Sequence, residues 1–419
     1  MSPRASSVRE VTDEYNKNIN ERSDFMSYLN FKDPYIDRRN TDSLKHDFAK
    51  EKGLPEDVMP MWVADMDFMA PEKVVEAITK RAEHGIYGYS DTKGDYYKAV
   101  AGWFKTRFDW DTEEKWLVKT PGVVFALATA VRATTKQGDA VIIQPPVYYP
   151  FFDVIRNNDR KIIESPLVYN DGKYTVDFED FEKKIIENDV KLFILCSPHN
   201  PVCRVWTKEE LIRLAEICHK HGVYVVSDEI HCDFVYKNKA KHTVFTEAAP
   251  FMKDKTIICT APSKTFNLAG LQTSNIFIPG DELRQAFEKQ VAVTGYTVMS
   301  NFGILACKTA YTYCHDWCDN CVEYISENFN FVRDFVKENL PGVRLVEAEG
   351  TYFAWLDFSA LGLTHEEVDD LIINKAGLWL DSGTIFGTGG ENFQRIVLAC
   401  PKSEIEKAMI RLKNAVTGE

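Results

Sequence analysis

Apolar runs alternate with amphipathic segments between residues 118 and 278, and this alternation limits the possible folds more than any other feature. Five runs have the length and composition of buried strands: 140–143, 192–196, 223–226, 256–259 and 275–278. Segments with helical spacing, such as 208–219, lie between several of them. Strands that are apolar on both faces need helices on both sides, so the pattern predicts a mostly parallel sheet covered by helices. In such sheets ligands bind outside the carboxyl ends of the strands.

The segments outside this region differ in character. Residues 60–68 combine apolar side chains with two carboxylates, which favours irregular structure near a site. Helical spacing covers residues 71–83 and, without interruption, residues 302–338. We expect four parts: a loose N-terminal arm (1–34), an N-terminal segment that contributes to the small domain and the interface (35–85), a large α/β domain (86–300) and a small C-terminal α+β domain (301–419).

Composition narrows the class of protein. The 50 Lys and Arg residues against 63 Asp and Glu residues give a net charge of −13, which argues against nucleic acid or an anionic membrane as the main partner. We find neither a signal peptide nor a run of about 20 apolar residues. The ten cysteines are scattered, and several lie in apolar runs, which predicts reduced thiols and a cytoplasmic protein.

Lys264 is the most informative single residue. It lies just past the predicted strand 256–259, next to Ser263. A lysine held there can lose its proton and attack a carbonyl carbon. An aldehyde cofactor that carries a phosphate needs such an amine.

Two polar residues follow other predicted strands. Asp228 comes directly after residues 223–227, where its carboxylate faces the ligand side of the sheet and could keep a pyridine nitrogen protonated. An N-cap carboxylate is the alternative. Asn200 follows the strand 192–196 and could donate to a phenolic oxygen, although a plain Asn-Pro turn has the same sequence.

Three further places in the chain suit a small anionic ligand with a flat ring. Gly122, Val123 and Val124 open a helix after a strand, where bare backbone N–H groups suit a phosphate. Tyr148 follows another strand and could stack on a ring, or simply pack. Arg395 precedes an apolar run and could bind a carboxylate, or form an internal ion pair.

Other patterns carry less weight. Neither a G-x-G-x-x-G sequence nor a Walker A loop is present, so dinucleotide and nucleoside triphosphate cofactors lose support. Cys314, Cys318 and Cys321 have the spacing of the iron–sulfur loop of radical-SAM enzymes, but they lie in a helical pattern that places them on one buried face. The histidines match no compact ligand set, so we expect no metal.

Taken together, these stretches resemble the fold-type-I pyridoxal-phosphate enzymes of the class I/II aminotransferase family. Residues 61–68, 36–43 and 228–231 are similar to the cystathionine β-lyase branch, whose members are C–S lyases. The resemblance extends from about residue 35 to the end of the chain. It implies an α/β fold with a mostly parallel central sheet, helices on both faces and a smaller α+β domain.

The resemblance also implies roles at matching positions. Lys264 would bind the cofactor covalently and move the Cα proton, and Asp228 would pair with the pyridine nitrogen. The other implied cofactor contacts are Asn200 and His231 at the phenolic oxygen, Tyr148 on the ring, Gly122, Val123, Val124 and Ser263 at the phosphate, and Tyr89 reaching the phosphate from the second subunit of a homodimer. The implied substrate contacts are Arg395 at the α-carboxylate, with Ala64, Tyr148 and Asn200 lining the pocket.

Several positions depart from the broader family pattern. Histidine at position 231 and glutamine at 272 are like the lyase branch, where many aminotransferases have tyrosine and arginine. The remaining departures are Ala261 for a phosphate-binding serine, Cys203 for the glycine of an Asn-Pro-x-Gly turn, and Val397 for an asparagine. If the turn needs a positive φ, cysteine fits it poorly.

The resemblance implies α,β-elimination on L-cystathionine or a related sulfur amino acid, which yields a thiol, pyruvate and ammonia. Transamination between an amino acid and a 2-keto acid is the first alternative. A binding or regulatory module built on the same fold is the second. Which sulfur amino acid is preferred stays open.

Overall fold

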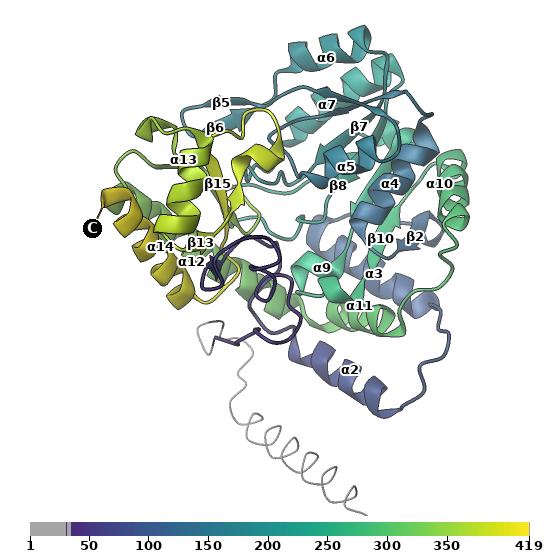
Figure 1. Cartoon of the computed structure of the whole chain (residues 1–419). Coiled ribbons are helices and arrows are strands. Elements are labelled where there is room, and N and C mark those ends of the chain that lie inside the picture. The colour runs from purple at the N-terminus through teal and green to yellow at the C-terminus, as the bar shows by residue number, and fades with distance from the viewer. Residues whose placement is uncertain (1–30, 32–34, 419) are drawn as a thin grey trace, which may run out of the picture.

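The structure, a computed structural model, describes Phe31 and residues 35–418 of the 419-residue chain. The predicted loose arm therefore lies outside the described residues, apart from Phe31. Figure 1 shows two bodies, a large one around the main sheet and a smaller one around the C-terminal helices, with the N-terminal segment in purple lying between them.

A seven-stranded sheet forms the centre of the larger body. Its strands, in spatial order, are β2 (Leu117–Thr120), β10 (Ser274–Phe277), β9 (Thr256–Thr260), β8 (Tyr224–Asp228), β7 (Val190–Cys196), β3 (Ala140–Ile143) and β4 (Lys161–Glu164). Strand β10 runs antiparallel to both its neighbours, and the pairs from β9 across to β4 are parallel. The prediction of a mostly parallel sheet is confirmed, and all five predicted strands are present. Strand β4 was not predicted, because only two apolar residues, Ile162 and Ile163, lie between its charged ends.

Helices bury both faces of this sheet. Along β7, Leu192 and Ile194 pack into one hydrophobic cluster, while Phe193 and Leu195 pack into the other, because successive side chains of a strand point to opposite faces. The helices of this body are α2 (Glu72–Glu83), α3 (Gly94–Phe108), α4 (Val123–Thr134), α5 (Pro150–Arg156), α6 (Phe178–Glu187), α7 (Lys208–His221), α8 (Phe245–Ala248), α9 (Pro262–Thr265), α10 (Asp281–Val293) and α11 (Asn301–Tyr313). Helix α2 confirms the helical spacing of residues 71–83.

The smaller body contains a four-stranded antiparallel sheet in the order β11 (Arg344–Leu345), β12 (Phe353–Asp357), β15 (Phe393–Val397) and β14 (Asp381–Ser382). Its helices are α12 (His315–Asn339), α13 (His365–Asp370) and α14 (Lys402–Thr417). Two short pairs complete the strands: β1 (Met59–Pro60) with β13 (Leu378–Trp379), and β5 (Val168–Asn170) with β6 (Lys173–Thr175). The short helices are η1 (Glu114–Trp116), η2 (Pro250–Lys255), η3 (Ala269–Leu271), η4 (Ser359–Leu361), η5 (Leu371–Lys375) and η6 (Gly383–Phe386).

The pairing of β1 with β13 joins the N-terminal segment to the smaller body. The predicted domain boundaries at residues 35, 86 and 301 remain predictions. Among the described residues, no helix is both long and apolar enough to cross a membrane.

The prediction of one long helix over residues 302–338 is wrong. Helix α11 ends at Tyr313, and α12 begins at His315. Cys314 lies between them with φ −115° and ψ 33°. Apolar side chains continue on both sides of this one-residue break, so hydrophobic periodicity does not detect it. Cys314, Cys318 and Cys321 are buried and unpaired, in agreement with the core-face interpretation of their spacing.

Candidate active site

A cavity of about 380 Å³ lies at the carboxyl ends of β2, β3, β7, β8 and β9. The segments that follow these strands contribute most of its wall. The lining residues are Ala64, Pro121, Gly122, Val123, Val124, Phe125, Tyr148, Cys196, Asn200, Asp228, Ile230, His231, Ser263, Lys264, Ala269, Gln272 and Thr273. The structure thus brings ten of the twelve predicted site residues to one cavity.

Lys264 lies in the short helix α9, which begins two residues after β9 ends. Its Nζ donates a hydrogen bond of 2.6 Å to the carbonyl oxygen of Ala64. Burial lowers the pKa of Lys264 to about 8; Arg395 lowers it further, while Asp65 and Asp228 oppose the shift. The lowered pKa makes the unprotonated amine, which a nucleophile or a base requires, easier to reach near neutral pH than in an exposed lysine.

Asp228 is the last residue of β8, opposite Cys196 of β7 and Cys259 of β9. Burial raises its pKa to about 7, although a hydrogen bond from the N–H of Ile230 and the charge of Lys264 oppose the shift. Residues 230–233 form turns rather than a helix, so the alternative N-cap role is wrong. A buried carboxyl at this edge can hold a proton on a ligand nitrogen.

Arg395 lies in the middle of the small sheet, in register with Asp381 on β14 and Trp355 on β12. The guanidinium pairs with Asp381 and donates from Nη1 to Oδ1 of Asn200 over 2.8 Å. The internal ion pair that the sequence left as an alternative is therefore present. Nε of Arg395, however, is buried and has no hydrogen-bond partner within the described part of the chain. A carboxylate oxygen would satisfy it.

Asn200 links Arg395 to the cavity. Because its amide oxygen accepts from the guanidinium, its amide nitrogen is the group that it can offer to a ligand. Asn200 is buried and lines the cavity, while Arg395 itself lies just behind the lining.

His231 and Tyr148 provide aromatic surface. The ring of His231 meets those of Tyr352 and Phe353 edge-on, with centroids 5.2 and 5.4 Å apart. Burial lowers the pKa of His231 well below its usual range, and Lys264 and Arg395 lower it further, so the imidazole is neutral. Its Nδ1 has no hydrogen-bond partner among the described residues. Burial raises the pKa of Tyr148, whose phenol therefore stays protonated.

The N-terminus of α4 faces the same cavity. Gly122 is its N-cap, and Val123 and Val124 are its first two residues. The backbone N–H groups of a first helical turn lack intrahelical partners and carry partial positive charge. Together with Ser263 and Thr273, they form a polar end that suits an anion.

Tyr89 is not brought to this cavity. Its side chain is 98% exposed, and it lies outside the lining residues of the same chain. Its predicted role as a contact from a neighbouring subunit stays a prediction.

One residue next to the Lys264 amine was not predicted from the sequence. Tyr352 donates from its hydroxyl to the Ala64 carbonyl over 2.9 Å, so this oxygen accepts from both Tyr352 and Lys264. A tyrosine directly before a strand gives no signal of such a contact, which joins residues 288 positions apart.

Among the departures from the family pattern, the backbone conformation at Cys203 tests the expectation for that position. Its φ is 60°, so the turn does need the left-handed conformation that glycine adopts most easily. The conformation of this turn confirms that cysteine fits it poorly. Nothing in the structure explains Ala261 or Val397.

The cavity fits pyridoxal 5′-phosphate in chemistry. A buried amine with a lowered pKa suits the aldehyde, and a buried carboxyl suits the ring nitrogen. The N-terminus of α4 suits the phosphate. The unpartnered Nδ1 of His231 and Nε of Arg395 are additional buried polar atoms beside the cavity.

Comparison with known proteins agrees with this chemistry. The profile of the aminotransferase class I and II family matches residues 56–412. The cystathionine β-lyase PatB of Bacillus subtilis is 41% identical over 389 residues, which is 93% of this chain and 100% of PatB.

Two solved structures, both of proteins with bound pyridoxal phosphate, are similar over most of their length. Cystalysin from Treponema denticola is 41% identical with a TM-score of 0.89, covering 93% of this chain and 99% of its own. A putative aminotransferase from Clostridium difficile is 41% identical with a TM-score of 0.89, covering 92% and 99%. The predicted fold, cofactor class and cystathionine β-lyase resemblance are confirmed by these matches. The chain belongs to the aminotransferase class I and II family.

Proposed function

We propose that the protein is a pyridoxal-phosphate-dependent C–S lyase, which cleaves L-cystathionine or a related sulfur amino acid to a thiol, pyruvate and ammonia. The observation that carries the proposal is the buried Lys264 amine, with a pKa of about 8, in one cavity with the Asp228 carboxyl. The 41% identity with a cystathionine β-lyase over nearly the whole chain supports the choice of reaction.

Pyridoxal phosphate, when bound, supplies an aldehyde carbon and an electron-withdrawing ring. Asp228 would hold a proton at the ring nitrogen, and Tyr148 would contact the ring. Asn200 and His231 would bind the phenolic oxygen. The N–H groups of Val123 and Val124 at the start of α4 would bind the phosphate, together with Gly122 and Ser263.

The substrate is held at its carboxylate and deprotonated at its Cα. Arg395 binds the α-carboxylate through Nε, the atom without an internal partner. Lys264 Nζ takes the proton from Cα, for which its lowered pKa suits it. The electron pair left at Cα forms a double bond to Cβ as the bond between Cβ and sulfur breaks, and the pair of that broken bond leaves with the thiolate. Water completes the conversion of the remaining three-carbon fragment to pyruvate and ammonia.

Transamination is the second candidate, because it begins with removal of the same Cα proton. The 41% identity with a putative aminotransferase favours keeping it. The two reactions differ in where the proton is delivered next.

We also propose that the protein is a cytoplasmic homodimer in which Tyr89 reaches the phosphate of the other subunit. Ile86, Tyr87 and Tyr89 form a segment of large apolar and aromatic side chains that are 59% or more exposed in a single chain. Such clustering is typical of a protein interface. The ten cysteines, all buried and unpaired, suit a reducing compartment.

The experiment is an assay of purified holoenzyme with L-cystathionine and no keto acid. Pyruvate and thiol formed in equal amounts support the lyase. Strict dependence on a keto acid, with a new amino acid formed, would replace it with the aminotransferase. The absence of bound pyridoxal phosphate would favour a binding or regulatory module. A Tyr89→Ala variant that keeps the cofactor as tightly as the original protein would contradict the shared site.

A further inference from the structure

Residues 61–68, here called the strap, pass beside Lys264, and Ala64 of this segment lines the cavity. The carbonyl oxygen of Ala64 accepts hydrogen bonds from Lys264 Nζ at 2.6 Å and from the Tyr352 hydroxyl at 2.9 Å. The position of this one backbone oxygen therefore decides where the reactive amine rests.

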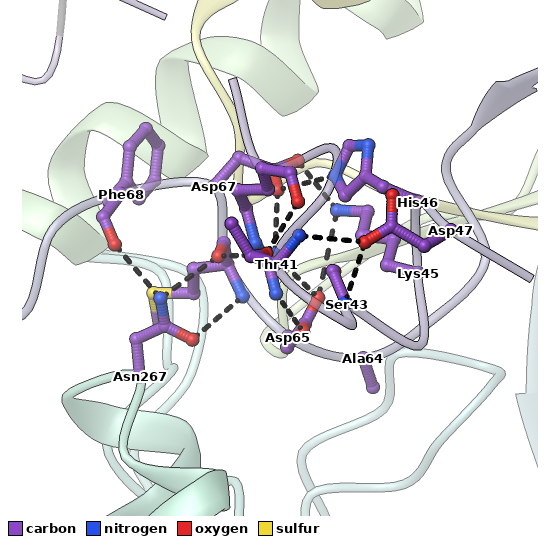
Figure 2. A network of polar contacts seen from close by, with 12 residues as sticks. Thr41, Ser43, Lys45, His46, Asp47, Ala64, Asp65, Asp67, Phe68 and Asn267 are labelled. Atoms are coloured by element: carbon purple, nitrogen blue, oxygen red, sulfur yellow. Dashed lines mark hydrogen bonds and ion pairs between the residues drawn. The ribbon is translucent and has the colours of Figure 1, made fainter. Parts of the chain in front are cut away.

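Charged side chains of the N-terminal segment form a cluster that pairs with the strap and holds it in place (Figure 2). Arg38 pairs through Nη2 with Asp65 at 2.7 Å and through Nη1 with Asp67 at 2.8 Å. Lys45, which is 1% exposed, pairs with Asp67 at 2.6 Å. Burial alone would raise the pKa of Asp67, but Lys45, His46 and Arg38 together hold it well below its usual range. Asp67 is therefore charged, and both strap carboxylates are held in ion pairs with cations from residues 38–46.

Asn267 holds the strap from the opposite side, where Figure 2 shows it beside Phe68. Its Nδ2 donates to the carbonyls of Met66 and Phe68 at 2.9 and 2.8 Å, and its Oδ1 accepts from the N–H of Met66 at 3.1 Å. Asn267 lies three residues after Lys264 and has a φ of 57°. The loop that carries the amine is thus bonded directly to the strap that carries its acceptor.

The ends of the strap are bonded to the small sheet. Val397 donates to the carbonyl of Met61, and the N–H of Asp67 donates to Ala399, both at 2.9 Å. The charged cluster and Asn267 restrain residues 65–68, the part of the strap that directly follows Ala64. Buried ion pairs add little net stability, because desolvation offsets their attraction. The cluster is better explained by the geometry that it imposes.

We propose that Arg38, Asp65 and Asn267 are positioning residues, which hold the Ala64 carbonyl against Lys264 and so set the resting place and proton affinity of that amine. The inference rests on the proposed function for the use of the amine, but the position and charge of Lys264 can be measured without it. Lys45 and His46 support Asp67 in the same cluster.

Three charged groups face Lys264 from the elements packed around it: Asp65 on the strap, Asp228 on β8 and Arg395 on β15. Replacing Asp65 by asparagine removes a negative charge and also loosens the strap through the loss of its ion pair with Arg38. Both changes disfavour the protonated amine, since Lys264 loses an attractive charge and a well-placed acceptor. Both effects therefore lower the pKa of Lys264.

The test compares Asp65→Asn with Asp37→Asn. Asp37 also pairs with an arginine of the same segment, Arg39, but this pair is exposed. In full-length protein freed of cofactor, acetylation of Lys264 by acetic anhydride is followed by peptide mass spectrometry over about pH 6 to 10. We expect the midpoint for Lys264 to fall by roughly one unit in Asp65→Asn and to stay unchanged in Asp37→Asn.

Steady-state kinetics of the holoenzymes give the second readout. We expect kcat/KM of Asp65→Asn to fall by roughly tenfold, because a small displacement of the amine is costly. An Asp65→Asn protein that matches Asp37→Asn in both midpoint and kcat/KM, even with a lower melting temperature, would show that the cluster is only structural.

Asn267→Gly provides an independent variant if Asp65→Asn does not fold. Glycine keeps the positive φ and removes the three strap hydrogen bonds. We expect kcat/KM to fall in the same way, and an unchanged value would overturn the proposal. If the original protein has no lyase activity but the acetylation midpoint still moves, the proposed function fails and the positioning inference stands.

Discussion

The two sides of the cavity are built in different ways. Lys264, Asp228 and Gly122 lie just past the ends of strands in one sheet, where the order of strands already brings them together. The opposite side depends on pairs that are far apart in the chain. Lys264 and Ala64 are 200 residues apart, and the Arg395 Nη2 that donates to the Trp62 carbonyl lies 333 residues away from it.

The two sides of the cavity therefore have different roles. The sheet edge supplies the reactive groups, and each of them follows a local strand pattern. The strap and the small sheet supply the restraints on those groups, and they exist only when distant segments pack. We therefore expect substitutions at the sheet edge to abolish activity, and substitutions on the other side to change stability or to reduce activity in part.

The largest effect is expected for Lys264→Ala. Removing the amine that takes the Cα proton should lower turnover of L-cystathionine by at least about 1000-fold. Lys289→Ala, at an exposed position of α10, is the matched control and should leave turnover unchanged. Comparable activity in the two variants would remove the distinction between the two sides.

The second largest effect is expected for the stability of the protein when Arg395, in the small sheet, is replaced. Arg395→Met leaves the buried Asp381 without its cation, which should lower the free energy of unfolding by about 3 to 5 kcal/mol. The double variant Arg395→Met, Asp381→Asn removes the unpaired charge and should recover part of this loss. Denaturant unfolding of the cofactor-free proteins measures both, and equal values for the single and double variants would contradict the explanation.

A pH effect should distinguish Asp228. Burial raises the pKa of Asp228 from 3.8 to about 7. Between pH 3.8 and pH 7, the folded protein therefore keeps a proton on this carboxyl group that the unfolded chain has released. The stabilising contribution of this group is complete below pH 3.8 and is lost as the pH rises towards 7. Asp228→Asn should cancel the loss, so the stability of the variant relative to the original protein should rise across this range by at most about 4 kcal/mol.

Urea unfolding of the two cofactor-free proteins at several pH values measures this difference. Asp153→Asn, at a position outside the cavity on α5, serves as the control. A difference between Asp228→Asn and the original protein that does not vary with pH would mean that Asp228 is ionised throughout.

The smallest effect is expected for Cys203→Gly. Glycine relieves the left-handed backbone at φ 60° but loses a buried side chain, and each change is worth about 1 kcal/mol. The two should nearly cancel. The same substitution at the buried Cys218, inside α7, relieves no strain and should cost about 2 kcal/mol. Similar losses at both positions would show that the turn at Cys203 is unstrained.

Local signals explain which features the sequence predicted. The strands that end near Lys264 and Asp228 are continuous apolar runs, so both the sheet and the edge position of these residues could be inferred. The break at Cys314 was missed because the apolar pattern does not change there. The contact of Tyr352 with Ala64 and the ion pairs of Asp65 were missed because each joins segments that meet only through tertiary packing.

Tyr89 marks the limit in the other direction. The family resemblance implies a cofactor contact from a neighbouring subunit, but the side chain of Tyr89 is exposed in the single chain. A contact with a second subunit cannot be seen in a single chain, so this role of Tyr89 stays a prediction.

The central claim is that the amine of Lys264, and no other, carries the aldehyde of pyridoxal phosphate. Borohydride treatment of the holoenzyme followed by peptide mass spectrometry tests it most directly. A phosphopyridoxyl group on the peptide that contains Lys264, in close to one copy per chain, is the predicted result. The same group on a different lysine, or unmodified Lys264 in a protein that contains the cofactor, would contradict the account.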